Sequence, residues 1–386
     1  MNRVRLGLIG LGNIGRHHAE YLLAGKVGHC DLTAVCARSA GSLEPYAKKG
    51  LATWTNAEDL VRSGTVDAVL IATPHYDHTT LGIAALEAGL HVMVEKPISA
   101  HKADAERLIK IARLNPALKF AAMFQLRVEP RYKKLRALIR DGELGRVVRV
   151  NWINTDWFRT EAYYASSEWR ATWKGEGGGV LLNQCLHNLD VLAWLLGPAA
   201  RVRGFCQLGR FHQIEVEDNV TAYFELPGGG TGVFVSSTGE SPGTNRLEIV
   251  GTRGKVVLED SRMRFVRNES DMLEFSACSP SGFAKPEVWN VEIPFENATA
   301  PHAQIMENFV QGILDGAELI TPAEEGLHSV ELANAIVYSS LIGETVEIPL
   351  DAAAYELKLQ ELIAASTVQK HIRKMDATDF AASFRR

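Results

Sequence analysis

The sequence of 386 residues is long enough for two folded domains, because a single hydrophobic core stops growing near roughly 250–300 residues. Its 46% hydrophobic and 23% charged residues are typical of a globular protein. A net charge of −5, with no basic block along the chain, argues against nucleic acid or an anionic membrane as main partner, since both require a concentrated positive surface.

The first third of the chain alternates short β-branched runs with segments of helical periodicity. The run VDAVLIA at 66–72 is apolar throughout, as expected of a strand that is covered on both faces. This alternation predicts a parallel, doubly wound Rossmann sheet, and we assign residues 1–124 to a dinucleotide-binding domain. The predicted strands are 4–10, 32–37, 52–54, 66–72, 91–95 and 120–124, and the predicted helices are 14–24, 43–49, 57–62, 78–88 and 103–114.

The pattern changes after residue 124. A basic-faced helix is expected over 130–141, and strands dominate from there on. We predict an α+β domain with a mostly antiparallel open sheet over 125–350, followed by a helical C-terminal extension over 351–386. The predicted strands are 147–154, 201–207, 220–226, 231–237, 246–250 and 255–259, and the predicted helices are 180–196, 302–314 and 323–340.

The cysteines and the N-terminal residues predict a cytoplasmic location. The five cysteines are scattered, and none forms a C-x-x-C pair, so we expect reduced thiols rather than a disulfide frame or a zinc cage. Residues 1–3 lead directly into an apolar strand, which predicts no signal peptide. No apolar run approaches the roughly 20 residues of a membrane helix. The cysteines are Cys30, Cys36, Cys185, Cys206 and Cys278.

A complete G-x-G-x-x-G follows the first strand and opens the first helix: Gly10, Leu11, Gly12, Asn13, Ile14 and Gly15. Gly10 permits the tight turn, Gly12 lets the backbone approach a pyrophosphate, and Gly15 allows close packing of helix and strand. The helix N-terminus attracts the phosphate charge. With both flanking elements in place, this turn predicts a nicotinamide dinucleotide as cofactor.

The end of the second strand bears on the choice between NAD and NADP. An acid that accepts hydrogen bonds from the ribose hydroxyl is typical of NAD binding, but here the strand ends in Arg38 and Ser39. These residues are suited to a 2′-phosphate, which favours NADP. The alternative, that Arg38 is a solvated loop residue and NAD is used, stays open.

Two further segments are expected at the same edge of the sheet. The fifth strand ends in Glu95-Lys96-Pro97, and the fourth leads to Thr73, Pro74 and His75, with His78 one helical turn on. Taken with the glycine turn, these motifs resemble the glucose–fructose oxidoreductase / inositol dehydrogenase family (Gfo/Idh/MocA) over roughly residues 3 to 350. The resemblance implies that these segments border the cofactor.

The family's second signature is a glycine run followed by Asp and, four residues on, His. Here Gly177–Gly179 precede Asn183, His187 and Asp190, whose spacing predicts that they share one helix face. The resemblance implies that Lys96 and His187 surround the reacting hydroxyl beside the nicotinamide. His187 suits the general base and Lys96 stabilises alkoxide character. Asn183 replaces the Asp of many members, and we expect it to orient His187 or to bind substrate.

The candidate substrate residues follow the sixth strand and the start of the second domain. Gln125 is assigned to the cofactor, and Arg127 either contacts substrate or forms a structural ion pair. Aromatic and cationic side chains gather between 157 and 174, where they suit a sugar, although some belong in the core or in a subunit interface. No histidine pattern predicts a metal site. The candidates in this segment are Trp157, Trp169, Arg170 and Trp173.

These observations predict an NAD(P)-dependent oxidoreductase that transfers a hydride to or from a hydroxyl or keto carbon of a sugar, glycoside or polyol. One alternative is a lyase that oxidises a sugar transiently before eliminating a neighbouring group. Another is a non-catalytic nicotinamide-binding sensor, supported by the Asn at position 183. The family resemblance also implies a homo-oligomer, either a dimer or a tetramer.

Overall fold

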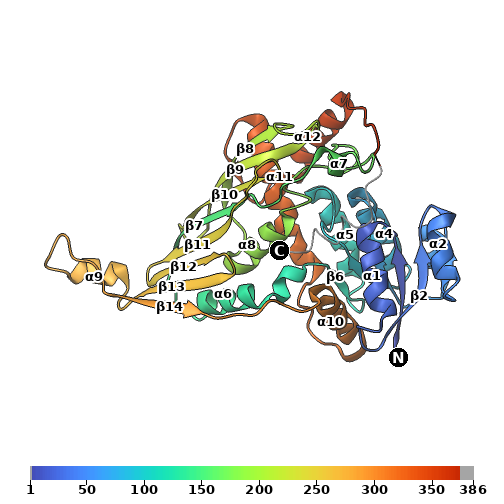
Figure 1. Ribbon diagram of the computed structural model, residues 1–386, viewed down its shortest axis with the longest axis horizontal. Coiled ribbons are helices and arrows are strands. Elements are labelled where there is room, and N and C mark those ends of the chain that lie inside the picture. The colour runs from blue at the N-terminus through green and yellow to red at the C-terminus, as the bar shows by residue number, and fades with distance from the viewer. Residues whose placement is uncertain (1, 374–386) are drawn as a thin grey trace.

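A computed structural model describes residues 2–373, which build two sheets (Figure 1). The strands of the first sheet are β1 (Val4–Ile9), β2 (Cys30–Cys36), β3 (Ala52–Trp54), β4 (Ala68–Ile71), β5 (His91–Val94) and β6 (Phe120–Ala122). They are all parallel, in the order β3-β2-β1-β4-β5-β6, which confirms the predicted Rossmann sheet. The order reverses between β1 and β4, where such sheets bind ligands beyond the carboxyl ends of the strands.

Helices cover both faces of this sheet, namely α1 (Asn13–Leu23), α2 (Ala40–Ala47), α3 (Ala57–Arg62), α4 (His75–Glu87), α5 (Lys102–Leu114) and α10 (Pro301–Asp315). Alternate residues of β4 point to opposite sides, so that Ile71 packs with α3, α4 and α5 and Leu70 packs with α1 and α10. Helix α10 therefore returns to the first sheet from a distant part of the sequence, which the predicted boundary at residue 124 did not anticipate.

The second sheet is built from β7 (Val147–Asn154), β8 (Arg201–Leu208), β9 (Glu217–Glu225), β10 (Thr231–Ser237), β11 (Asn245–Gly251), β12 (Gly254–Glu259), β13 (Arg262–Asn268), β14 (Val288–Ile293) and β15 (Val346–Glu347). Its order is β14-β13-β12-β11-β7-β10-β9-β8-β15. All neighbours are antiparallel except β7 and β10. The mostly antiparallel second sheet is thereby confirmed.

Within residues 2–373, helices cover only one face of the second sheet. Helices α6 (Pro130–Arg140), α8 (Leu186–Leu196) and α11 (Gly326–Ile342) belong to this domain, and Figure 1 shows α8 and α11 between the two sheets. Trp152 and Phe234 are buried on the covered side, whereas their neighbours Ile153 and Val233 are more than a third exposed. Alternation along each strand thus leaves apolar side chains on the outer face.

Several elements differ from the sequence prediction. Strands β13, β14 and β15 and helices α7 (Glu161–Tyr164) and α9 (Met272–Cys278) were not predicted. Figure 1 shows α9 projecting from the body beyond β13 and β14, and none of its residues is buried, so it lacks the buried stripe of a core-facing helix. The helix predicted over 180–196 begins only at Leu186.

The C-terminal extension is helical in part. Helix α12 (Ala352–Ala365) forms the first part of the predicted extension, but residues 366–373 are not helical, and residues 374–386 lie outside the described residues. Within residues 2–373, no helix combines the length and the apolar composition needed to cross a membrane.

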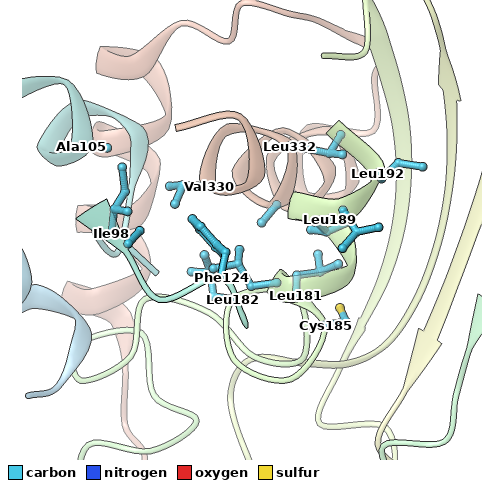
Figure 2. Packing of buried hydrophobic residues seen from close by; sticks show 14 of the residues in the cluster. Ile98, Ala105, Phe124, Leu181, Leu182, Cys185, Leu189, Leu192, Val330 and Leu332 are labelled. Carbon is cyan, nitrogen blue, oxygen red and sulfur yellow. The ribbon is translucent and has the colours of Figure 1, made fainter. Parts of the chain in front are cut away.

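One hydrophobic cluster joins the two domains. Figure 2 shows Phe124, which follows β6, among Ile98 of the first domain and Leu182 and Val330 of the second. All four side chains are almost completely buried. Since buried side chains pack as densely as organic crystals, this shared core fixes the turns after β5 and β6 relative to α8.

Candidate active site

The three glycines of the first turn have different reasons to be glycine. A Cβ on Gly10, whose φ is +102°, would lie 2.4 Å from the carbonyl oxygen of Ala72, and a Cβ on Gly15 would lie 2.0 Å from the carbonyl oxygen of Gly10. A Cβ on Gly12 would meet nothing within 4 Å. The first and third glycines are therefore required by the protein's own backbone, whereas the second keeps a cradle open for a ligand.

The start of α1 completes an anion site at this turn. Gly12 is the N-cap and provides no capping side chain, and Asn13 and Ile14 begin the helix with no acidic residue in its first turn. The first backbone N–H groups of a helix lack partners within it, and they attract negative charge. These features fit the pyrophosphate of a dinucleotide.

We expect Gly12→Val to weaken dinucleotide binding by about tenfold or more, because its side chain would fill the cradle beside the helix N-terminus. The melting temperature of the free protein should stay close to that of the parent, since no atom lies where the Cβ would be placed. Isothermal titration with NADH and NADPH measures the affinity. Gly228→Val, at another glycine with open surroundings, is the matched control; equal affinities of the two variants would contradict the prediction.

The residues after β2 are available to a ligand. Arg38 is exposed and forms no ion pair with any residue of the described range 2–373. Ser39 is the N-cap residue of α2, and its side chain makes no capping hydrogen bond. Both residues follow the carboxyl end of β2.

His78 connects the turns that follow β4 and β5. Its Nδ1 lies 2.7 Å from the carbonyl oxygen of Pro97, and its Nε2 lies 2.8 Å from that of Thr73. Pro74 is the N-cap of α4, and the Nδ1 of His75 lies 2.9 Å from the carbonyl oxygen of Glu176 in the second domain. The two predicted histidines thus hold the backbone that frames the site, and burial lowers the pKa of both rings.

A buried histidine–carboxylate pair lies directly before the lysine. The Nε2 of His18, on α1, is 2.7 Å from Glu95 Oε1, and the other carboxylate oxygen accepts a hydrogen bond from the backbone N–H of Lys96 at 3.1 Å. Burial opposes ionisation of Glu95, but the hydrogen bond from His18 and the charges of His18, His302 and Lys96 outweigh it and lower the pKa to about 2. Glu95 is therefore a fixed negative charge beneath Lys96.

The side chain of Lys96 crosses to the second domain. Its Nζ donates a hydrogen bond of 2.6 Å to the backbone carbonyl of Asn183. Burial lowers the pKa of Lys96, Glu95 and Glu176 oppose this change, and Arg170 adds to it. Lys96 is thus a cation whose proton is held less tightly than that of a solvated lysine.

His187 lies in the first turn of α8, and only 8% of it is exposed. Gln125 donates through its amide to Nε2 of this ring at 3.3 Å, and the ring meets Phe124 edge-on. Burial lowers the pKa of His187 well below its usual value, and the nearby charge of Lys96 lowers it further. The imidazole is therefore neutral at pH 7 and is placed near Lys96, as the sequence predicted.

Among residues 2–373, three buried polar atoms that lack a hydrogen-bond partner belong to residues at this edge. They are Thr73 Oγ1, Gln125 Oε1 and His187 Nδ1. Each belongs to a residue that the sequence assigned to cofactor or substrate. Leaving a buried polar atom unpaired costs free energy, so their common position fits a polar ligand.

Asn183 does not share a helix face with His187, contrary to the prediction. It precedes α8, its amide donates to Glu176 Oε1, and its carbonyl accepts from Lys96. The helix starts late because the carboxylate of Glu217 accepts the backbone N–H groups of Gly179 and Leu181 and holds them in a turn. Asn183 therefore positions Lys96, and Gln125 contacts His187 in its place.

Arg127 forms the structural ion pair that was one of its two predicted roles. Its Nε and Nη2 donate to the two carboxylate oxygens of Asp190 at 2.9 and 2.6 Å, and its Nη1 donates to Glu325. Only 2% of Arg127 is exposed. The guanidinium of Arg127 forms its hydrogen bonds within the protein, so this geometry does not support the predicted contact with substrate.

Glu176 was missed by the sequence analysis. It is buried, accepts hydrogen bonds from Ala171 N–H and Asn183 Nδ2, and lies 4.0 Å from Arg170 Nη1. Burial raises its pKa, although Arg170 and these hydrogen bonds oppose the rise. The sequence did contain a signal for this residue, because Glu176 is an acid inside the glycine-rich run at positions 175–179.

Some side chains of the aromatic segment 157–174 lie near the site, and others lie in the core. Trp173 is 3% exposed and belongs to the hydrophobic core, which corrects its assignment to substrate. Trp169 meets His75 edge-on at 5.7 Å, and the Arg170 guanidinium lies 4.7 Å from the Trp169 ring. Trp157 is partly buried, and its Nε1 donates to Asn154 Oδ1 at 2.5 Å. Trp169 and Arg170 are thus the members placed next to the histidine and glycine segments.

Two family models match the chain. An oxidoreductase family with an NAD-binding Rossmann fold matches residues 4–122, and the GFO/IDH/MocA C-terminal domain matches residues 132–257. The rhizopine catabolism protein MocA of Rhizobium meliloti is 35% identical over 200 residues, which cover 51% of this chain and only 58% of that protein. An inositol 2-dehydrogenase of Rhizobium meliloti (strain 1021) is 25% identical over 345 residues, or 87% of this chain and 96% of that one.

A solved structure agrees with the sequence matches. The WlbA dehydrogenase from Bordetella pertussis, in complex with NADH and UDP-GlcNAcA, is similar with a TM-score of 0.76 and 25% identity, covering 90% of this chain and 100% of that one. Its similarity extends over both sheets, in agreement with the two family models. The chain belongs to the Gfo/Idh/MocA family of NAD-binding oxidoreductases.

Proposed function

We propose that this protein is an NAD(P)-dependent dehydrogenase or reductase that acts on a hydroxyl or keto carbon of a sugar, glycoside or polyol. The observation that carries the proposal is the placement of Lys96 and His187 together beyond the strand ends of the first sheet, next to the glycine turn. The relatives support this substrate class, since they include an inositol 2-dehydrogenase and a dehydrogenase solved with UDP-GlcNAcA.

The nicotinamide, when bound, accepts a hydride from the substrate carbon or returns one. In the oxidative direction the hydroxyl must also lose its proton. Gln125 donates to Nε2 of His187, which leaves the lone pair of the neutral ring on that nitrogen and the proton on Nδ1. Nε2 is therefore the atom that accepts the hydroxyl proton, once the substrate hydroxyl replaces the Gln125 amide at this lone pair. Lys96 Nζ holds the substrate oxygen and stabilises its developing negative charge.

The test is to follow the nicotinamide absorbance with a panel of sugars, glycosides and polyols, using both NAD and NADP. We expect turnover with at least one of them. No turnover with any substrate and either cofactor, by a protein that still binds the cofactor, would contradict the proposal.

We further propose that NADP is the preferred cofactor, because the exposed Arg38 and Ser39 follow β2, where an acid is typical of NAD binding, and their side chains suit a 2′-phosphate. Arg38→Ala should weaken NADPH binding by about tenfold and leave NADH binding unchanged, since only NADPH has the 2′-phosphate. Thermal shifts with NAD, NADH, NADP and NADPH measure this, because a ligand that binds the native state raises its melting temperature. Arg62→Ala, at the opposite edge of the sheet, is the control.

The outer face of the second sheet bears on the oligomeric state of the protein. The exposed apolar side chains on the outer face of the second sheet suit self-association, and we propose a dimer or tetramer formed through that face. Light scattering of the parent measures the mass directly. The exposed apolar side chains on that face include Ile153, Phe205, Tyr223 and Val233.

The cysteines of the described residues are all free, which fits a reducing compartment such as the cytoplasm.

A further inference from the structure

The segment after α12 folds back onto the loop that carries Trp169 and Arg170. Figure 1 shows α12 and the chain that follows it near α7. Lys370 Nζ donates to the backbone carbonyl of Tyr164 at 3.0 Å and to that of Arg170, and the backbone N–H of Arg373 donates to the carbonyl of Ala165 at 2.9 Å. One ammonium group thus joins two carbonyls six positions apart.

The peptide between Arg170 and Ala171 is held from both sides. Its carbonyl oxygen accepts from Lys370, and its N–H donates to the carboxylate of Glu176. A cation on the oxygen and an anion on the N–H both favour the same orientation of the peptide dipole. Glu176 also binds Asn183, whose carbonyl accepts from Lys96. A chain of direct contacts therefore links Lys370 to the candidate catalytic lysine.

This peptide needs outside support because of its conformation. Ala171 has a φ of +52°, in the left-handed region that favours glycine, and it is fully buried. Between α7 and α8 the chain forms no long helix or strand, so few of its backbone groups are fixed by regular structure. The contacts of Lys370 and Glu176 replace that missing support.

The charged surroundings of Lys370 match this role. Burial lowers its pKa, Glu176, Glu215 and Glu161 oppose that change, and Arg170 adds to it. An ammonium in such a position exchanges water for two carbonyl oxygens, which makes its hydrogen bonds stronger than those of an exposed lysine.

We propose that Lys370 is a positioning residue for substrate: the segment 366–373, together with Glu176, fixes the loop 161–173 so that Trp169 and Arg170 face the site. The segment lies beyond residues 4–122 and 132–257, which the two family models match. The inference rests on the proposed function for its substrate, but the state of the loop is measurable without any turnover.

The test compares the parent with Lys370→Met and Lys370→Arg in the full chain. We expect Lys370→Met to raise the KM for the sugar or polyol about tenfold with a smaller change in kcat, and to leave the affinity for NADPH unchanged. Hydrogen exchange of residues 161–173 should become faster in the same variant. Lys370→Arg, which can donate to both carbonyls, should restore both properties in large part. Lys358→Met is the matched control, because Lys358 lies on α12 and its described ion-pair partner is Glu361, on the same helix.

Two truncated chains distinguish the role of the segment 366–373 from that of the residues that follow it. A chain ending at Ala365 should behave like Lys370→Met, and a chain ending at Arg373 should behave like the parent. Unchanged exchange of the loop in Lys370→Met would overturn the proposal, whether or not the parent turns over any substrate. Faster exchange with an unchanged KM would overturn the role in substrate binding. A parent without activity would refute the proposed function alone, since the exchange result still decides whether Lys370 holds the loop.

Discussion

Replacing Lys96 with methionine should lower kcat/KM by about 10²–10³-fold, the usual loss when a charge-stabilising donor is removed from a site. Methionine keeps the approximate length of the side chain but cannot hold the substrate oxygen or stabilise its negative charge. Since the cradle at Gly12 is formed by other residues, the affinity for NADPH should change much less than kcat/KM. Steady-state kinetics and titration of the cofactor measure the two effects separately.

The control for this variant is Lys119→Met, at the amino end of β6 and therefore at the opposite edge of the same sheet. It should retain the activity of the parent. A Lys96→Met protein that folds, binds NADPH and still turns over substrate at the parental rate would show that the ammonium group has no part in the reaction.

His187→Ala should lower kcat by about 10²–10⁴-fold, the range expected for loss of a general base. The pH profile gives the sharper result. Burial and the charge of Lys96 lower the pKa of His187, so the ring is neutral and able to accept a proton until the pH falls well below 6.5. The rate of oxidation should therefore decline on the acid side only below that pH, and this limb should be absent from the variant.

The alkaline side of the same profile reports on Lys96. Its lowered pKa means that the ammonium loses its proton, and the rate falls, at a pH below the ordinary lysine value of 10.5. Measurement of kcat/KM from acid to alkaline pH tests both limbs, with His29→Gln, an exposed histidine, as control. A parental acid limb with a midpoint above 6.5, or an identical limb in His187→Ala, would rule out His187 as the base.

The parts of the site that were predicted correctly are those fixed by neighbours in sequence. The glycine turn lies between a strand and a helix that are both evident from their periodicity, and Lys96 directly follows an apolar strand. In a parallel sheet the strand ends meet at one edge, so local patterns were enough to place these residues together.

The parts that were missed depend on contacts between distant residues. Apolar residues at 180–182 continue the helical pattern of α8 backwards, but Glu217 draws the backbone amides before the helix into a turn. Because of this contact, Asn183 precedes the helix instead of facing His187, and it forms its hydrogen bonds with Glu176 and Lys96. Arg127 likewise found its partner in Asp190, at a position that no local pattern indicates.

The segment proposed to bind the substrate is irregular chain supported at a few points, whereas the glycine turn lies between a strand and a helix of a packed sheet. Replacements in the former leave the strands and their hydrogen bonds intact, whereas replacements at Gly10 or Gly15 of the latter would clash with the backbone. Evolution can therefore exchange one substrate for another with little loss of folding stability. The same division makes the stretch from 157 to 170 the natural target for library-based redesign, with the lysine and the imidazole left unaltered.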